Sequence, residues 1–362
     1  MPDISHATDG AAEAARRPAS LTLVPVADEK LSTKDFKSDQ EVRWCPGCGD
    51  YAILAAFQSF LPELGIPREN LVIISGIGCS SRLPYYVDSY GMHSIHGRAP
   101  AIATGLASTR PDLSVWVITG DGDALSIGGN HLIHALRRNV NINILLFNNR
   151  IYGLTKGQYS PTSEQGKVTK STPFGSLDTP FNPVSLALGA EASFVARTID
   201  SDRKHLQGVL RAAADHRGAS FIEIYQNCPI FNDDAFEPLT SPESRDDRLI
   251  RLEHGQPVRF GHEGSKGLRF GRYGALEAVD VAGADEDSLL VHDAHAADPS
   301  YAFALSRLDS PAFAHTPIGV LRQAPRPSYD DAMAAQLEEA RAKQGEGDLA
   351  ALLAGPDTWQ VS

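Results

Sequence analysis

The sequence predicts an α/β fold: a mostly parallel sheet with helices on both faces, followed by a C-terminal extension. Three observations support this prediction. Short, continuous apolar runs at 71–75, 113–120 and 142–147 are typical of strands that are buried on both faces. Segments whose apolar residues have helical spacing separate these runs, as repeated strand–helix–strand units require. Apolar side chains make up 42% of the 362 residues, which is enough to cover such a sheet.

The first elements follow in order along the chain. Residues 1–35 are rich in Ala, Ser, Asp and Pro without periodicity, and we interpret them as a flexible N-terminal arm. A helix is predicted after WCPGCGD, where Ile53, Leu54 and Phe57 have helical spacing. The small residues of APAIATGLAS predict a second helix. The GDGD that follows strand 113–120 opens a third helix, which we expect to continue through HLIHALRR.

The second half of the chain begins with a polar stretch, 159–180, that contains no clear element. A loop of this length inside a domain is usually functional. A helix and the strand 219–227 then resume the alternation, so we expect residues 36–235 to form one domain. The rest, 236–362, carries short strand-like and helical segments and is interpreted as the C-terminal extension.

Composition and charge exclude several classes of function. The net charge of −12 and the pI near 5.4 argue against binding to nucleic acid or to an anionic membrane. No apolar run reaches the ~18 residues of a membrane span. The N-terminus lacks the apolar core of a secretory signal, so a cytoplasmic protein is expected. Four cysteines in so long a chain favour metal or redox use over a disulfide framework.

A phosphate site is predicted where ITGDGDALSIGG follows a strand and opens a helix. Glycines let backbone amides approach an anion, and a helix N-terminus supplies donors and partial positive charge. The Asp121 carboxylate would repel phosphates unless a divalent cation lay between them, and Mg²⁺ commonly combines one or two carboxylates with phosphates. Asn148 and Asn149 end the next strand, at the same edge of a parallel sheet. The sequence therefore predicts a magnesium–phosphate site at this edge.

The Gly-Asp-Gly of this site is followed, after 25 residues, by Asn-Asn. This spacing resembles the motif of thiamine-diphosphate enzymes. The resemblance implies that Asp121 and Asn149 bind Mg²⁺ through their side chains and Ile151 through its carbonyl. It also implies the residues that line the diphosphate side of the cofactor, which are Gly122, Asp123, Gly153 and Leu154.

The cysteines form one Cys-x-x-Cys pair, Cys45 and Cys48, and two distant single residues, Cys79 and Cys228. A redox disulfide within the pair would leave the two single cysteines without a role. A zinc ion would use all four, but structural zinc sites usually combine two such pairs. Both single cysteines follow predicted strands, which places them at the edge that carries the phosphate site. An iron–sulfur cluster held there by four thiolates would be close enough to accept electrons from a cofactor.

Together these motifs resemble the β subunit of the 2-oxoacid:ferredoxin oxidoreductases, most closely the 2-oxoglutarate type. The likeness is close over residues 37–232 and weaker to about 325. It rests on WCPGCGDY, GIGCSSRLPYY, HGRAPAIATGLA, GDGDALSIGGNH, NNRIYGLTKGQYSPTS and the Cys-Pro that ends strand 219–227. The resemblance implies that the four cysteines bind one [4Fe–4S] cluster. It further implies thiamine contacts from Ile77, Gly78, Ser80, His96, Gly97, Arg98 and Ala99.

The reaction of this family is the oxidative decarboxylation of a 2-oxoacid with coenzyme A, which gives an acyl-CoA and CO₂ and reduces ferredoxin. The thiamine cofactor carries the chemistry, so the resemblance assigns no side chain of this chain as a nucleophile. Arg82 and Lys156 are the side chains expected to bind the substrate, because the two carboxylates of a dicarboxylate need two cationic partners. LTKGQ resembles the 2-oxoglutarate type, so 2-oxoglutarate, which would yield succinyl-CoA, is preferred over pyruvate or a broad range of 2-oxoacids.

The chain shows only one of the two sheets that thiamine enzymes use, since the aminopyrimidine binds to a second domain. The resemblance therefore implies an α subunit and an α₂β₂ assembly, and the C-terminal extension is expected to dock against this partner or to cover the cluster. Two other classes stay open on the residues alone. They are a thiamine enzyme without electron transfer and a zinc-stabilised binding module.

Overall fold

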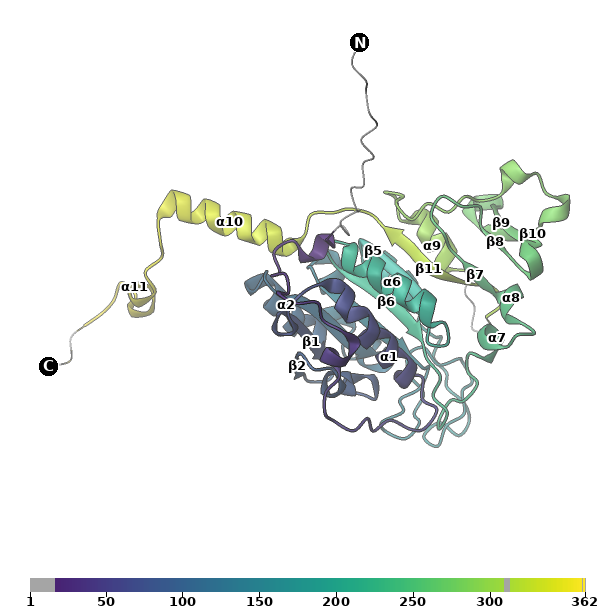
Figure 1. Cartoon of the computed structure of the whole chain (residues 1–362), viewed down its shortest axis with the longest axis horizontal. Helices are drawn as coiled ribbons and strands as arrows, with labels where there is room; N and C mark the ends of the chain where they lie inside the picture. The colour runs from purple at the N-terminus through teal and green to yellow at the C-terminus, as the bar shows by residue number, and fades with distance from the viewer. Residues whose placement is uncertain (1–16, 309–312, 360, 362) are drawn as a thin grey trace, which may run out of the picture.

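The central feature of the fold is an eight-stranded sheet in the computed structural model, which describes residues 17–308, 313–359 and 361 (Figure 1). The strands lie in the order β2-β1-β3-β4-β6-β5-β11-β7. The first six are parallel, β11 is antiparallel to β5, and β7 is parallel to β11. In that spatial order the strands are Tyr90–His93, Leu71–Ser75, Ser114–Gly120, Asn143–Asn148, Ser220–Tyr225, Phe194–Ile199, Thr316–Gln323 and Leu249–Arg251.

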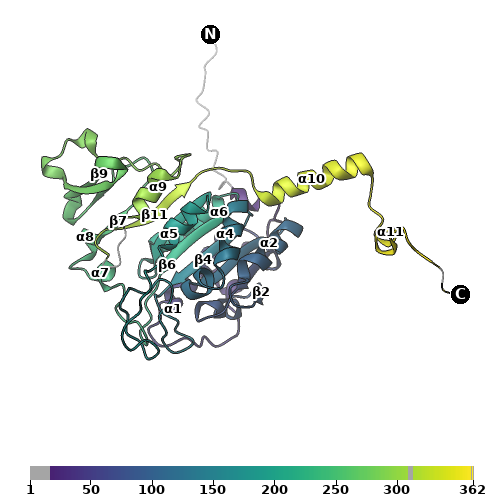
Figure 2. The ribbon, with the colours of Figure 1, turned by 180° about the vertical axis from the view of Figure 1, so that it is seen from behind.

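Helices cover both faces of this sheet, and each face has its own apolar core (Figure 2). On one face, α1 (Asp50–Phe60) packs beside α6 (Arg203–Asp215) over Trp116 and Phe147. On the other face lie α2 (Ala99–Thr109), α4 (Gly129–Arg138), α5 (Pro183–Gly189) and α9 (Ser300–Ser306). The predicted fold class is therefore confirmed.

The predicted strands at 71–75, 113–120, 142–147 and 219–227 correspond to β1, β3, β4 and β6. The helix predicted from GDGD through HLIHALRR is wrong as one element. It is divided into α3 (Asp121–Leu125) and α4 by a turn at Ser126, whose ψ of −105° is not helical. The turn brings Gly128 against Gly97, where a Cβ on Gly97 would lie 2.5 Å from the Gly128 nitrogen. This close approach joins two loops beside the predicted phosphate site.

The N-terminal arm is partly docked on the body over the residues that the structure describes. Leu21 and Val24 are almost fully buried in the core beneath α1 and α6, and Ser20 Oγ donates to the carbonyl of Ala214. Phe36 belongs to the same core. Leu21 and Val24 thus dock this stretch beside α6, whereas Leu23 and Val26 are 55% and 62% exposed. Residues 1–16 of the predicted arm lie outside the described part.

The C-terminal part begins with α7 (Glu237–Thr240) and α8 (Arg245–Arg248). It also contains a small antiparallel sheet of β8 (Arg259–Phe260), β9 (Lys266–Phe270) and β10 (Leu276–Asp280). Its strand β11 then returns to the main sheet, so part of the predicted extension is built into the central core. The division of the chain into domains otherwise stays a prediction.

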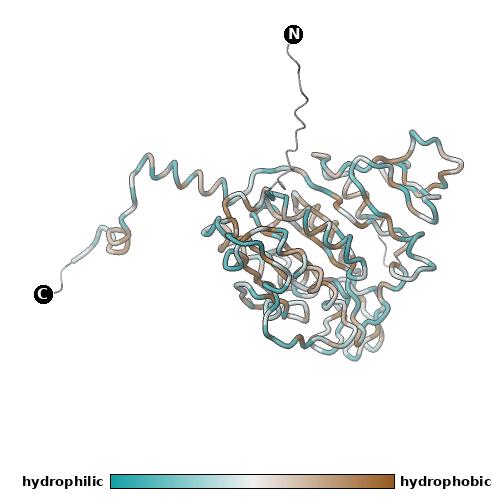
Figure 3. The backbone as a smooth tube through the Cα atoms, in the orientation of Figure 1, coloured by the Kyte–Doolittle hydropathy of each residue, from teal (hydrophilic) through white to brown (hydrophobic). Residues whose placement is uncertain are grey.

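The last two helices, α10 (Tyr329–Gln344) and α11 (Leu349–Ala354), stand away from this body (Figure 1). In Figure 3 the most hydrophobic backbone gathers in the body, and α11 is a separate hydrophobic element. Among the described residues, no helix has both the length and the apolar character needed to cross a membrane. The carboxyl ends of β1, β3, β4 and β6 meet at one edge of the sheet, and their loops form the site.

Candidate active site

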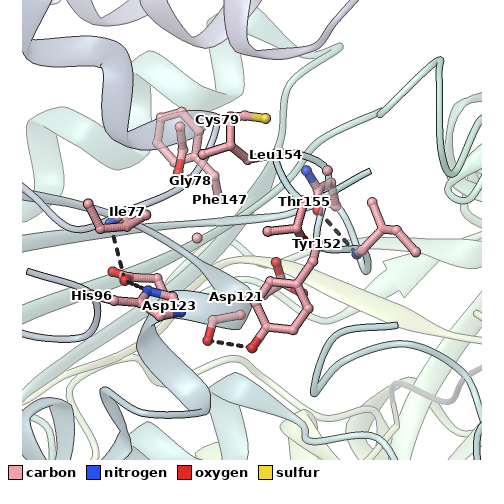
Figure 4. Close-up of a pocket in the computed structure, with 16 residues that line it drawn as sticks. Ile77, Gly78, Cys79, His96, Asp121, Asp123, Phe147, Tyr152, Leu154 and Thr155 are labelled. Atoms are coloured by element: carbon pink, nitrogen blue, oxygen red, sulfur yellow. Dashed lines mark hydrogen bonds and ion pairs between the residues drawn. The ribbon is translucent and has the colours of Figure 1, made fainter. Parts of the chain in front are cut away.

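A cavity of about 190 Å³ opens at the carboxyl edge of β1, β3 and β4 (Figure 4). Cys79 lies at one end of this cavity, and Asp121, Asp123 and His96 lie toward the other. Most residues expected to contact cofactor or metal line it, namely Ile77, Gly78, Cys79, Ser80, His96, Asp121, Gly122, Asp123, Asn149, Ile151, Gly153 and Leu154. Other expected site residues do not line it, namely Arg82, Gly97, Arg98, Ala99, Lys156 and the other three cysteines.

Asp121 stands at the start of α3 with its carboxylate buried. The Thr162 hydroxyl lies 2.6 Å from Asp121 Oδ2 and 2.9 Å from Asn148 Oδ1. Burial raises the pKa of Asp121 to about 6, because no water shell stabilises its charge. A divalent cation beside it would supply that stabilisation. Thr162 comes from the loop 159–180, for which the length of the loop alone predicts a functional role.

The two adjacent asparagines have different roles. Asn148 is buried and donates through Nδ2 to Glu223 Oε1 at 2.8 Å, so its amide is part of the sheet's interior. Asn149 lines the cavity, and its Oδ1 accepts from the backbone nitrogen of Ile151. Asp121, Asn149 and the Ile151 carbonyl offer the oxygen ligands that Mg²⁺ prefers. The residues present therefore fit a magnesium ion.

Asp123 lines the cavity, but its carboxylate joins the surrounding loops. It accepts from the Gly97 nitrogen at 2.7 Å, the Ile77 nitrogen at 3.2 Å and the Thr119 hydroxyl at 2.7 Å. A Cβ on Gly76 would lie 1.7 Å from Asp123 Oδ2, so only glycine fits there. The sequence predicted a direct cofactor contact for Asp123 and did not identify this bridging role, because its partners lie in three separate segments.

The His96 ring is held by the same carboxylate, through a contact between Nδ1 and Asp123 Oδ1. An ionised carboxylate only accepts hydrogen bonds, so this contact assigns the proton of neutral His96 to Nδ1 and leaves Nε2 as an acceptor. His96 begins the turn before α2 and is partly exposed at the cavity. Arg98, two residues later, donates to the Ile127 carbonyl at 3.4 Å.

Tyr152 is a lining residue that sequence reasoning missed, because nothing in NNRIYGL distinguishes it from its neighbours. Its hydroxyl donates to the Gly122 carbonyl at 3.0 Å, and burial raises the pKa of the phenol. A Cβ on Gly122 would lie 2.1 Å from Tyr152 Cε1. Glycine at position 122 is thus required for the packing of this ring.

The thiol end of the cavity brings together the two distant cysteines. A Cβ on Gly153 would lie 3.5 Å from Cys79 Sγ and 3.8 Å from Cys228 Sγ, so both sulfurs face one point of the loop after β4. Cys48 Sγ lies 3.1 Å from Gln226 Nε2, next to the end of β6. Cys45 is exposed and Cys228 is buried. None of the four forms a disulfide, so the redox-disulfide alternative has no support in this structure.

Burial desolvates the thiols and the nearby carboxylate of Asp50. Burial raises the pKa of Cys79 to about 12 and also raises that of Cys48, and the nearby Cys228 contributes to both shifts. Burial raises the pKa of Asp50 to about 7, with Asp200 adding repulsion. Within the described residues, no group of three or more His, Cys, Asp or Glu side chains could hold a metal ion. The four thiols are therefore not placed around a single ion.

The two expected substrate cations lie outside the cavity lining. Arg82 donates through Nε to the Tyr86 hydroxyl at 3.1 Å, and its charge opposes the rise in the pKa of Cys79. Lys156 is exposed and follows Thr155, which does line the cavity. Its φ of 71° is unusual for a residue other than glycine, and such strain is concentrated at functional sites.

Comparisons with known proteins place the chain among related sequences. Residues 76–224 match the family model for the C-terminal TPP-binding domain of thiamine pyrophosphate enzymes. The chain is 64% identical over 340 residues to the 2-oxoglutarate oxidoreductase subunit KorB of Mycobacterium tuberculosis, covering 93% of this chain and 91% of that protein. It is 43% identical over 212 residues to the 2-oxoacid:ferredoxin oxidoreductase subunit beta of Sulfolobus sp, covering 58% and 68%.

A solved structure is also similar. The 2-oxoglutarate:ferredoxin oxidoreductase from Magnetococcus marinus, with 2-oxoglutarate, coenzyme A and succinyl-CoA bound, aligns with a TM-score of 0.69 and 34% identity. The alignment covers 91% of this chain and 97% of that chain. The similarity therefore extends well beyond the TPP-binding domain and includes much of the C-terminal part.

Proposed function

The chain belongs to the β subunits of the 2-oxoacid:ferredoxin oxidoreductases, and we propose that it serves in the cytoplasm as the β subunit of a 2-oxoglutarate-specific member. The enzyme would decarboxylate 2-oxoglutarate oxidatively, transfer the acyl group to coenzyme A as succinyl-CoA, and pass two electrons to ferredoxin. The names of the relatives from Mycobacterium tuberculosis and Magnetococcus marinus support this choice of substrate over pyruvate or a broad range of 2-oxoacids.

One observation carries the proposal: a single cavity joins a set of oxygen ligands to the thiol of Cys79, which lies near that of Cys228. Asp121, Asn149 and Ile151 line one part of it, and Cys79 lines another, with Cys228 close to Cys79 at Gly153. An enzyme that moves electrons from a thiamine cofactor to an iron–sulfur cluster needs this proximity. A thiamine enzyme without electron transfer would have no use for it.

When bound, thiamine diphosphate would supply an electron sink for the carbon–carbon bond that is broken. The chain's own residues would bind and orient it. Asp121, Asn149 and the Ile151 carbonyl would hold Mg²⁺ against the diphosphate, and the backbone amides at Gly122 would approach its oxygens. The apolar side chains of Ile77 and Leu154 would exclude water on the cavity side.

A [4Fe–4S] cluster is the group that best suits the four cysteines. A zinc ion would require all four sulfurs about 2.3 Å from one centre, and the thiols are not placed around a single ion. A cluster spreads its thiolates over a larger core, and its positive iron ions would compensate the desolvated sulfurs of Cys48 and Cys79. Cys45 would give the cluster its most exposed corner.

The substrate's two carboxylates would pair with Arg82 and Lys156. Arg82 lies close to Cys79, and Lys156 follows the loop that lines the cavity. Lys156 is exposed, so its long flexible side chain would be able to reach a substrate at the cavity. A monocarboxylate such as pyruvate would need only one of the two cations.

The second half of the cofactor site would come from an α subunit, in an α₂β₂ enzyme. The cavity is partly open, and the large apolar side chains of Ile77 and Leu154 are 43% and 53% exposed at its rim. Exposed apolar groups around a polar site are typical of a surface that a partner covers. Ferredoxin and coenzyme A are the remaining proposed partners.

The test is anaerobic purification of the chain with its α subunit, followed by ferredoxin reduction with 2-oxoglutarate, pyruvate and other 2-oxoacids. We expect a brown protein with about four irons per β chain and activity that depends on added thiamine diphosphate, Mg²⁺ and coenzyme A. Lys156→Ala should raise KM for 2-oxoglutarate far more than for pyruvate, with Lys170→Ala as an exposed control in the neighbouring loop. A colourless protein with one zinc per chain would contradict the proposal.

A further inference from the structure

The C-terminal arm, defined as residues 329–359, is anchored to the body only at its start. Arg217 forms ion pairs with Asp330 and Asp331 in the first turn of α10, and the Asn141 nitrogen donates to Asp330 Oδ1. Arg138 lies over the Tyr329 ring at 5.9 Å. These contacts fix the direction of α10. The helix projects outward from the end of the body that contains α2 and β2 (Figures 1 and 2).

Beyond its first turn, α10 is a polar spacer. Asp330 is the one buried residue of this helix, which is described over its whole length. Ser328 caps its N-terminus by accepting from the Asp331 nitrogen. Glu338 pairs with Arg341 at 2.8 Å, and Glu339 pairs with Lys343. A 16-residue helix rises about 24 Å. It therefore carries the segment that follows it well away from the body.

That segment is apolar and uncovered. Leu349, Leu352 and Leu353 of α11 are 68%, 77% and 78% exposed, and their spacing places them on one side of the helix. Trp359 is 82% exposed. Asp348 caps the helix through the Ala351 nitrogen. A helix of six residues does not form stably in water by itself, so its stability has to come from packing against another surface.

The charge of the segment indicates the surface that it fits. Residues 345–362 contain three acidic side chains and no Lys, Arg or His, and the whole chain carries a net charge of −12. A second copy of this acidic chain is a poor match. An apolar groove with Lys and Arg at its rim is complementary, because it buries the leucines and attracts the flanking carboxylates.

The place of the arm indicates which partner offers this groove. The arm extends from the side of the body that ends in β2, the outermost strand of the sheet. All four residues of β2 are exposed, and Tyr90, Met92 and nearby Ile95 are 66%, 48% and 76% exposed. His96, which lines the cavity, follows directly. A subunit that completed the cavity from this side would lie between the body and the arm.

We propose that the C-terminal arm clasps the α subunit, with the leucine face of α11 in an apolar groove of that subunit whose rim is basic. This inference rests on the proposed function, because that function supplies the α subunit. The edge strand β2 and the arm then hold the partner from two directions. Since α10 is anchored at the opposite edge of the sheet from the cavity, the clasp contributes to assembly without contacting the cofactor.

The test compares the complex of the full-length chain and its α subunit with two variants. Leu352→Glu combined with Leu353→Glu should raise the α–β dissociation constant by about tenfold or more, as measured by mass photometry on dilution. Removal of residues 345–362 should have the same effect. Leu337→Glu, at an exposed leucine of α10, is the matched control and should leave the dissociation constant unchanged. Hydrogen exchange of 349–354 should slow when the α subunit is added to the wild-type chain.

An α–β dissociation constant within about twofold of wild type in both variants would overturn the inference. So would weaker association between β chains with unchanged binding of the α subunit, because the arm would then hold a second copy. Iron content and ferredoxin reduction by the wild-type complex separate the two proposals. If the complex forms and turns over but the arm variants bind normally, only the clasp fails; if wild-type β binds no α subunit, the proposed function itself fails.

Discussion

The two edges of the parallel sheet each carry a buried polar cluster, and the clusters differ in what their polar groups face. At the amino edge, the Asn139 side chain donates to the Arg326 carbonyl at 2.9 Å and accepts from the Ala219 nitrogen at 2.9 Å. The Ser193 hydroxyl contacts both Asn139 and the His216 ring. The groups of this cluster pair with one another, and their role is to join β4, β5 and β6 to the root of the arm.

At the carboxyl edge, groups of the same kinds adjoin a cavity. Asp121 is buried with a raised pKa, the thiols of Cys48 and Cys79 are desolvated, and the lining residues face the cavity. Burial of polar groups is thus common to both edges. The difference is that the groups of the amino-edge cluster face one another, whereas those at the carboxyl edge face a space that can hold a ligand. Buried titratable groups around a cavity are therefore the better sign of a ligand site.

The largest expected effect is loss of the cluster. Cys79→Ala removes one of the four thiols, so the iron content of the anaerobically purified complex should fall from about four per β chain to nearly none. Iron analysis and visible absorbance measure this. Ser193→Ala, in the amino-edge cluster, is the control and should keep its iron. Full iron content in the Cys79 variant would show that the carboxyl edge does not bind a cluster through this thiol.

The next effect concerns the metal. Asp121→Asn removes the carboxylate that would face Mg²⁺, and we expect the affinity for thiamine diphosphate with Mg²⁺ to fall by about 100-fold in calorimetric titration. The free energy of unfolding of the unliganded chain should not fall. Burial raises the pKa of Asp121 to about 6, so its charge opposes folding at pH 8. Asp28→Asn, at an exposed residue, should change neither quantity.

At the amino edge the same kind of change should act on stability alone. Asn139→Ala leaves the Ala219 nitrogen and the Arg326 carbonyl without their partner, and it places alanine at a φ of 58°. We expect the free energy of unfolding in urea to fall by about 2–4 kcal/mol. Thiamine diphosphate affinity should stay within about twofold of wild type. A large loss of affinity would mean that the two edges are coupled.

The smallest effect is a pH dependence of the amino edge. Burial lowers the pKa of His216 to about 4, and the Arg326 guanidinium adds to this shift. Between pH 6.5 and 4 the unfolded chain binds this proton and the folded chain does not, so the contribution to stability is complete above pH 6.5 and declines as the pH falls. His216→Gln should remove about 1–2 kcal/mol of the acid-induced loss in urea unfolding between pH 7 and 5. Parallel pH profiles of variant and wild type would argue against a neutral buried His216.

Several strands could be predicted because their residues carry a local signal. The runs that form β1, β3, β4 and β6 are continuous and apolar, as strands covered on both faces must be. The strand β5 was not predicted, because Arg197 interrupts its apolar pattern. Arg197 is fully buried and pairs with Glu223 of β6 at 2.7 Å. A residue type that is usually exposed therefore lies in the core. The return of β11 likewise depends on pairing with a strand more than a hundred residues earlier.

The sequence by itself determined which residue types stand at the ends of the strands. Cys79, Cys228, Asp121 and Asn149 follow apolar runs, and in a parallel sheet such positions meet at one edge whatever the loops do. The resemblance to thiamine-diphosphate enzymes and to 2-oxoacid:ferredoxin oxidoreductases implies the assignment of these residues to metal and cluster, because their chemistry and that topology alone left a zinc ion open. Their specific roles stay predictions until ligand binding is measured.

Only the tertiary structure decided how these residues are supported. Thr162 contacts Asp121 from 41 residues away, Asp123 accepts from two loops and from β3, and Tyr152 packs against Gly122. These contacts connect segments that no periodic pattern relates, so chain folding and loop packing, not composition, select them. For the same reason the sequence did not predict α11 or its distance from the body.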